Sequence, residues 1–319
     1  MNEFELIKKY FLRLSKSNKS SLNLNDDVFF DKKNNLVISV DTYNEESHFI
    51  DFKKPELVIK KIIRSSISDL ICKGVQPKFY FISGSGNKKK FSKKNLSKIS
   101  KSLKQEQKKY GISLCGGDTT YSNSLSFTIT SLGYSKNIIY RNKVKSNDDI
   151  YVTGNLGDSF IGLQILKKKF KFKKKINDYF IKKYFLPDIQ IKLAKKLLKF
   201  ANSSIDISDG LISDLEKMLN NQNYSFIINE HQIPISKHLK NLINDTKFKK
   251  YKLISNGDDY QVLFTANVNK SRIIQKTSNN LGIKITKIGK IISGKKKNIL
   301  IDQKDKQILL KYKGYIHQF

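Results

Sequence analysis

The 319-residue chain has few of the features that mark several common protein classes. Its two cysteines, Cys72 and Cys115, could pair, but nothing suggests a disulfide framework, so we expect two buried, inert thiols and a cytoplasmic protein. It has no apolar run of roughly 18 residues, which argues against a transmembrane helix and a membrane partner. The N-terminal segment MNEFELIKKYFLRL carries acids inside an amphipathic pattern, unlike a signal peptide.

Acidic residues are also scarce, because 28 Asp and Glu stand against 61 Lys and Arg, which gives a formal net charge of +33. Such a charge invites a nucleic-acid-binding hypothesis. The densest basic runs, at 88–94, 167–175 and 295–297, are scattered and poor in arginine, the residue that base and bidentate phosphate recognition favours. We therefore predict no specific nucleic-acid partner and keep a basic nucleic-acid-binding protein as the alternative from a different class.

Several well-known motifs are missing. There is no GxxxxGK[ST] sequence, and the loop at 154–158 is not GxGxxG, so neither a P-loop nor a Rossmann fold is supported. No GxSxG elbow occurs, which disfavours a serine hydrolase. His231, His238 and His317 lack the spacing of zinc ligands.

What the chain does contain is an alternation of helical patterns and short apolar runs. Apolar residues recur at helical spacing over 4–14. Pro55 opens a second helix at a position where its missing N–H costs nothing, and Gly74 ends that helix. The segment 187–201 also has the pattern of a helix. Strand-like runs stand between these helices.

The length favours two domains, since single hydrophobic cores stop growing near roughly 250–300 residues. Both halves show the same order of strand, glycine-containing loop and helix. We predict an α/β (α+β) fold with two α/β lobes, residues 1–148 and residues 149–319.

Some of the few acids lie in small-residue loops beside predicted strands. Asp26 and Asp27 are adjacent, so a cation would relieve their repulsion, although a polar turn is the alternative. Asp41 follows the strand 36–40, where the Ser39 hydroxyl could share an ion. Mg²⁺ is usually held by a few carboxylates plus substrate phosphates. The pattern predicts a Mg-dependent phosphotransferase.

Two glycine-containing loops extend this pattern. In GGDTT the glycines let backbone amides approach phosphate oxygens, and Asp118 can hold the bridging ion, with a plain turn as the alternative. In DISDG, Asp206 and Ser208 share one strand face, and Asp209 stands at a helix start that suits anions. Both loops fit phosphate and metal chemistry.

Ten segments occur in a characteristic order along nearly the whole chain. They are FELIKKYF (4–11), NDD (25–27), ISVDT (38–42), SHF (47–49), SDLICKGVQP (68–77), GGDTT (116–120), YVTGNLGDS (151–159), SIDISDGLISDL (204–215), SNGDDYQVLFT (255–265) and KGYIHQF (313–319). Together they resemble the thiamine-monophosphate kinase family, in the superfamily of aminoimidazole ribonucleotide (AIR) synthetase and selenide, water dikinase.

The resemblance implies direct in-line phosphorylation of thiamine monophosphate by ATP, with several Mg²⁺ ions. The products would be thiamine diphosphate and ADP, in the last step of thiamine diphosphate biosynthesis. It implies an AIR-synthetase-like N-terminal domain that binds ATP and Mg²⁺ and dimerises through its strands. A second AIR-synthetase-like domain follows, and the active site lies in the cleft near the dimer contact.

The resemblance also implies roles for individual residues. Magnesium ligands would be Asp27, Ser39, Val40, Asp41, Asp69, Asp118, Asp206 and Asp209. ATP would contact Gly117, Asp118, Arg141 and Ser208. Thiamine monophosphate would contact His48, Asp258 and Tyr315. The candidate catalytic residues are Asp41, Asp118 and Asp206.

The chain departs from the family pattern at a few positions. Asn25 stands where Gly is usual, and Asn tolerates the left-handed conformation. Val40 replaces a usual Thr: if the ligand atom there is the carbonyl, nothing is lost, and if it is the hydroxyl, one metal contact is gone. Asp258 replaces a usual Glu and is one methylene shorter. Selenide, water dikinase is disfavoured because no Cys lies in the first 71 residues; AIR synthetase stays open as another superfamily enzyme.

Overall fold

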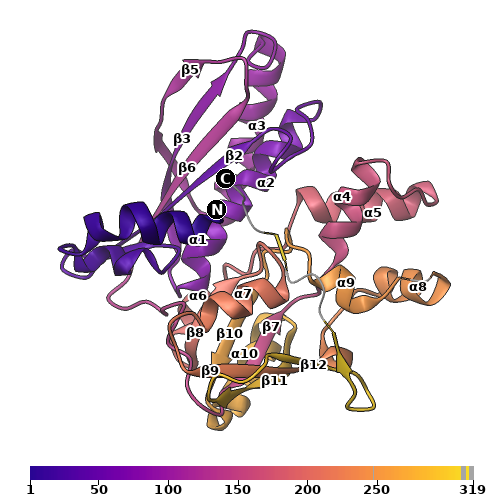
Figure 1. Cartoon of the computed structure of the whole chain (residues 1–319). Coiled ribbons are helices and arrows are strands. Elements are labelled where there is room, and N and C mark those ends of the chain that lie inside the picture. The colour runs from indigo at the N-terminus through magenta and orange to yellow at the C-terminus, as the bar shows by residue number, and fades with distance from the viewer. Residues whose placement is uncertain (247, 310–313, 316–319) are drawn as a thin grey trace.

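The computed structural model describes residues 1–246, 248–309 and 314–315. Two sheets organise this part of the chain (Figure 1). The strands are β1 Phe29–Asp31, β2 Leu36–Asn44, β3 Pro77–Gly86, β4 Ser113–Gly116, β5 Thr119–Tyr121, β6 Ser126–Tyr134, β7 Asp149–Thr153, β8 Ala201–Asp206, β9 Tyr224–Asn229, β10 Val262–Ala266, β11 Ile285–Ser293, β12 Ile299–Ile301 and β13 Gln307–Ile308. The predicted mixed α/β class is confirmed.

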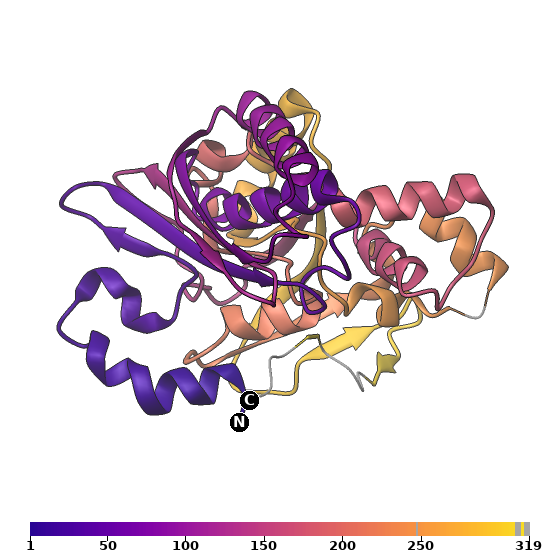
Figure 2. The same cartoon turned by 90° about the horizontal axis from the view of Figure 1, so that it is seen from above.

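The helices cover these sheets and join the two halves. They are α1 Glu3–Leu6, α2 Pro55–Cys72, α3 Lys93–Tyr110, α4 Asp158–Leu166, α5 Lys174–Phe185, α6 Ala194–Leu197, α7 Leu211–Met218, α8 Lys237–Asp245, α9 Lys250–Ile254 and α10 Ser271–Leu281. Figure 2 shows that α4, α5 and α8 gather at one end of the molecule, far from the N-terminal helical segment.

Each half of the chain supplies its own sheet. The first has the order β1-β2-β6-β3-β4, with β5 paired to β3, and the second has the order β13-β12-β9-β11-β7-β10-β8. The first sheet ends at Tyr134 and the second begins at Asp149. The domain boundary between residues 148 and 149 stays a prediction.

Helix α2 lies between the two halves. It packs against β2, β6 and α3 on one side and against β8, β10, α5 and α6 on the other. As predicted, Pro55 lies in its first turn, and Gly74 follows its end with φ +79°, which favours glycine. Because the helix is covered on both sides, several of its polar residues are buried as well, among them Lys61 and Arg64. Asp69, in its last turn, also lies between the halves.

The first sheet has one covered face and one open face. On β2, Val37, Ser39 and Tyr43 point inward and are buried, whereas Val40 points outward and is 61% exposed. Phe81 lies two strands away in the same row, because Val40 and Phe81 both pair with Thr130 of β6. The open face is thus rich in apolar side chains.

Two local expectations are wrong. The segment 187–201 contains only the short helix α6, because the Asp188 carbonyl accepts hydrogen bonds from the side chains of Gln190 (3.0 Å) and Gln261 (3.1 Å) instead of serving a helix. Cys115 is exposed on the sheet, whereas Cys72 is buried as expected, and both are free thiols. No helix within the described residues is long and apolar enough to span a membrane.

Candidate active site

A cavity of about 290 Å³ lies between the two halves of the chain. The side chains around it come from β2, α2, α4, the β8–α7 turn and the loop before β10. The predicted site residues among them are Asp41, His48, Asp69, Asp206, Ser208, Asp209, Asp258 and Tyr315. Residues more than 270 positions apart in the chain thus meet at one cavity.

Three aspartates form one end of this cavity; Asp206 is buried, and Asp41 and Asp69 are partly buried. Asp41 comes from β2, Asp69 from the last turn of α2 and Asp206 from the end of β8. The Ser39 hydroxyl donates to Asp69 Oδ2 at 2.6 Å, and the Ser68 hydroxyl donates to Asp206. Oδ2 of Asp41 is buried without a hydrogen-bond partner in the described part of the chain.

The electrostatics of this acidic end follow from burial. Removal from water raises the pKa of Asp41 to about 7 and that of Asp206 to about 7. Burial, together with the neighbouring charge of Asp41, raises the pKa of Asp69 well above its usual range. Buried carboxylates so close together are stable as anions only beside cations.

The donor set fits a magnesium site. Carboxylate and hydroxyl oxygens are ligands that Mg²⁺ prefers, and the orphaned oxygen of Asp41 needs a partner. Among the described residues, no three His, Cys, Asp or Glu side chains are arranged as a ready metal cage. Mg²⁺ is commonly bound by one or two carboxylates plus substrate phosphates. The predicted ligands Asp41, Asp69 and Asp206 suit that manner of binding.

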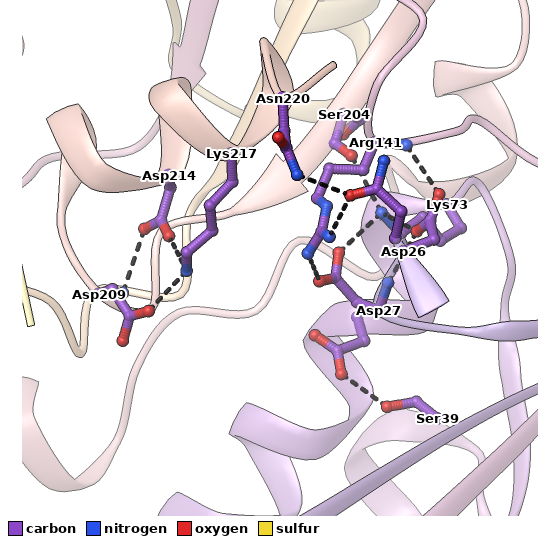
Figure 3. Close-up of polar contacts among 12 residues, drawn as sticks. Asp26, Asp27, Ser39, Lys73, Arg141, Ser204, Asp209, Asp214, Lys217 and Asn220 are labelled. Carbon is purple, nitrogen blue, oxygen red and sulfur yellow. Dashed lines mark hydrogen bonds and ion pairs between the residues drawn. The ribbon is translucent and has the colours of Figure 1, made fainter. Parts of the chain in front are cut away.

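A second acidic group lies beside the first and already has cationic partners (Figure 3). Lys73 Nζ lies 2.7 Å from Asp26 Oδ1 and 2.8 Å from Asp27 Oδ2. Arg141 Nη1 lies 2.7 Å from Asp27 Oδ1. Burial opposes ionisation of Asp27, but Lys73 and Arg141 hold its pKa below the usual range. The predicted residues Asp27 and Arg141 therefore form an ion pair with each other.

Asp209 takes part in a third charged group, at the start of α7 (Figure 3). Lys217 Nζ lies 2.5 Å from Asp209 Oδ2 and 2.7 Å from Asp214 Oδ1. Asp214 Oδ2 accepts from the backbone N–H groups of Asp209 and Gly210, as in a capped helix start. The carbonyl of Asp209 accepts from the N–H of Tyr315 at 3.0 Å, which brings this C-terminal residue to the cavity. The rest of KGYIHQF, apart from Gly314, lies outside the described residues.

The other end of the cavity carries His48 and Asp258. The backbone N–H of Asn44 donates to His48 Nδ1 at 3.0 Å, which fixes the imidazole. The Tyr260 hydroxyl donates to Asp258 Oδ1 at 3.1 Å. Tyr43 and Tyr260 also line the cavity there. This end offers aromatic surface with a few directed polar groups, as small-molecule sites commonly do.

Three predicted positions lie elsewhere. Asp118 is exposed and three strands from Asp41, because β6, β3 and β5 follow β2. That separation is roughly 14 Å, too far for one ion to join both carboxylates within one chain. Gly117 precedes Asp118 where a Cβ would lie 1.8 Å from the Ile82 carbonyl oxygen, so only glycine fits. The side chain of Val40 points away from the acids. Only the backbone carbonyl of this residue could therefore serve as a metal ligand.

Three lysines in and beside this site are absent from the sequence predictions. Lys61, Lys73 and Lys217 each pair with an aspartate in the interior. Lysine is so abundant in this chain that its presence carried little information. The position of Lys61 in the sequence could have identified it as a buried lysine, since it interrupts the apolar pattern of α2.

Comparison with known proteins places the chain in a family. The family model of AIR synthase related protein, N-terminal domain, matches residues 25–135. Thiamine-monophosphate kinase of Buchnera aphidicola (subsp. Schizaphis graminum) is 38% identical over 99% of this chain and 98% of the relative. The enzyme of Haemophilus influenzae is 35% identical over 91% of this chain and 89% of the relative.

Solved structures agree with these sequence relatives. The structure described as AaThiL complexed with AMPPCP and TMP has a TM-score of 0.83 and 26% identity, covering 99% of this chain and 97% of that one. Thiamine monophosphate kinase of Aquifex aeolicus has a TM-score of 0.79 and 25% identity, covering 97% and 99%. The predicted AIR-synthetase-like fold is thereby confirmed. The chain belongs to the thiamine-monophosphate kinase family.

Proposed function

We propose that this protein transfers a phosphoryl group from ATP to thiamine monophosphate, which yields thiamine diphosphate and ADP. The observation that carries this function is the full-length similarity to thiamine-monophosphate kinases. The cavity supports it, because eight predicted residues line a space with acids at one end and aromatic groups at the other. ADP release that depends on thiamine monophosphate tests the function. A cytoplasmic location stays a prediction, to which two free thiols conform.

The acidic end of the cavity is where the two phosphate groups would meet. Asp41, Asp69 and Asp206 would hold magnesium there, with Ser39 fixing one of these carboxylates. Bound Mg²⁺ ions would neutralise the phosphates and align the phosphoryl group. Two unit charges 4 Å apart repel by roughly 4 kcal/mol at an effective dielectric of 20, so this neutralisation is the main requirement.

The chain itself contributes positioning rather than acid–base chemistry. The attacking group is a phosphate oxygen, which is anionic near neutral pH and needs no general base. Arg141 and Ser208 are the proposed ATP contacts, and Arg141 is fixed by its ion pair with Asp27. His48, Asp258 and Tyr315 are the proposed contacts of thiamine monophosphate. Placing both substrates in line accounts for the rate, and we propose direct transfer without a phosphorylated enzyme.

We further propose that the protein is a homodimer and that Asp118 serves the site of the other copy. Val40, Phe79 and Phe81 lie on the open face of the first sheet, each between 38% and 61% exposed. An apolar face of this kind is typical of a protein–protein contact. A second copy packed on it would bring its own Asp118 loop towards the acidic end. This arrangement would account for the distance between Asp118 and Asp41 within one chain, which is too large for one ion to join both carboxylates.

Co-expression of two inactive chains tests this arrangement. One chain carries Asp118→Asn and the other carries Asp206→Asn. In a mixed dimer, one of the two sites combines the intact Asp206 of the first chain with the intact Asp118 of the second. Random pairing makes about half of the dimers mixed, so the whole preparation should recover about a quarter of the wild-type activity. If Asp118 acts within its own chain, every site keeps one defect and the mixture stays inactive.

A further inference from the structure

Lys61 of α2 is a buried lysine at the substrate end of the cavity. Only 1% of its side chain is exposed. A charge taken out of water costs several kcal/mol unless it is paired. The pairing partners of such a group therefore show what keeps it in the interior.

The ammonium of Lys61 joins three separate segments. Its Nζ lies 2.7 Å from Asp258 Oδ1 and 3.6 Å from the ring centroid of Tyr184. It also donates to the carbonyl oxygen of His48 at 3.2 Å, and the Tyr184 hydroxyl donates to the same oxygen at 3.2 Å. The His48 carbonyl and the Tyr184 ring thus hold the ammonium in place against Asp258.

Asp258 is an unusual residue in its own right. Its backbone has φ +68°, a left-handed conformation that non-glycine residues seldom adopt. Its N–H donates to the Ser208 carbonyl at 2.9 Å, which fixes the loop against the β8–α7 turn. Its Oδ1 pairs with the ammonium of Lys61 and accepts a hydrogen bond from the Tyr260 hydroxyl. Oδ2 has no hydrogen-bond partner among the described residues, although Asp258 lines the cavity.

These contacts distinguish the roles of the two residues. Lys61 is covered and cannot touch a ligand in the cavity, whereas Asp258 can present Oδ2 to one. The ion pair occupies Oδ1 and fixes the carboxylate in one orientation. It also offsets the charge of Asp258 from the side away from the cavity, which stabilises the ionised carboxylate.

We propose that Lys61 is a positioning residue for thiamine monophosphate, acting through Asp258. This inference rests on the proposed function, because it assumes that Asp258 contacts the thiamine part of that substrate. The carboxylate of Asp258 then binds the cationic thiazolium or the aminopyrimidine of the substrate. ATP binds at the acidic end and is not affected by Lys61.

Lys61→Met tests the proposal, since it keeps much of the length of the side chain and removes the charge. We expect KM for thiamine monophosphate to rise roughly tenfold to a hundredfold, as when one charge-assisted contact is lost. KM for ATP should stay within about twofold, as should both constants in the control Lys60→Met, on the adjacent half-buried residue. Equal changes in both KM values, or none, would overturn the proposal. A wild-type protein without activity would instead refute the proposed function.

A second variant guards against a Lys61→Met protein that fails to fold. Lys61→Met/Asp258→Asn removes both charges and leaves no unpaired carboxylate. If Lys61 acts through Asp258, this double variant has the same KM for thiamine monophosphate, within about twofold, as Asp258→Asn alone. A KM more than about fivefold above that of Asp258→Asn shows that Lys61 acts by another route and overturns the proposal.

Discussion

Asp41→Asn is expected to lower kcat by roughly 100- to 1,000-fold, the loss typical of removing one electrostatic element of a transition-state site. The side chain keeps its shape, but its orphaned buried oxygen no longer offers a charge to magnesium. The loss should appear with saturating Mg²⁺ and both substrates. Turnover close to that of the wild type would remove Asp41 from the proposed metal ligands.

The same substitution should stabilise the metal-free protein at alkaline pH. Burial raises the pKa of Asp41 to about 7, so the folded wild type loses stability as the pH rises from about 4 through 7. Asn stays neutral, and the melting temperature of the variant in EDTA should exceed that of the wild type at pH 8. The difference should be smaller at pH 5 and should vanish only below about pH 4, where Asp41 is protonated in both the folded and the unfolded chain. The exposed Asp245→Asn is the matched control and should melt like the wild type at both pH values.

Lys73→Met is expected to destabilise the fold by about 3–5 kcal/mol, because it leaves the buried Asp26 carboxylate without its cation and Asp27 with Arg141 alone. The Lys73 side chain is fully buried and pairs with Asp26, itself 2% exposed, and with Asp27. It also donates to the Ser204 carbonyl at 3.1 Å, so the lysine joins the two halves of the chain. The measurement is the midpoint of urea unfolding.

Two further variants make this prediction specific. Lys78→Met removes an exposed lysine of β3 and should leave the midpoint unchanged. Lys73→Met/Asp26→Asn removes one of the stranded charges and should recover part of the lost stability. A midpoint for Lys73→Met equal to that of Lys78→Met would contradict the role given to this buried ion pair.

Local signals predicted much of the framework. Pro55 and Gly74 marked the ends of α2 because each has a conformational preference that acts within a few residues. Once these two ends are known, Asp69 is placed on the last turn of α2. The alternation in β2 likewise separates Ser39 from Val40, although which face would be open depends on what covers the sheet.

Non-local contacts account for what the sequence left out. The strand order places β6 and β3 between Asp41 and the Asp118 loop, and no local pattern specifies that order. The segment 187–193 is non-helical because a distant side chain, Gln261, binds the Asp188 carbonyl. Cys115 is exposed because β4 lies towards an open edge of the first sheet.

The buried lysines show a different limit. In a chain with 61 Lys and Arg, most lysines are solvated, and composition alone cannot separate the few that are paired inside. Lys61, Lys73 and Lys217 become distinct only when their aspartate partners come together in the fold. They indicate that part of the basic character serves the site itself.

The most direct test of this account is product analysis by chromatography after incubating the purified protein with ATP, Mg²⁺ and thiamine monophosphate. The account predicts one thiamine diphosphate for each ADP formed, almost no ADP without thiamine monophosphate, and nearly complete loss of both products with Asp41→Asn. ATP hydrolysis at the same rate with and without thiamine monophosphate, or no thiamine diphosphate although ATP and magnesium bind, would contradict it.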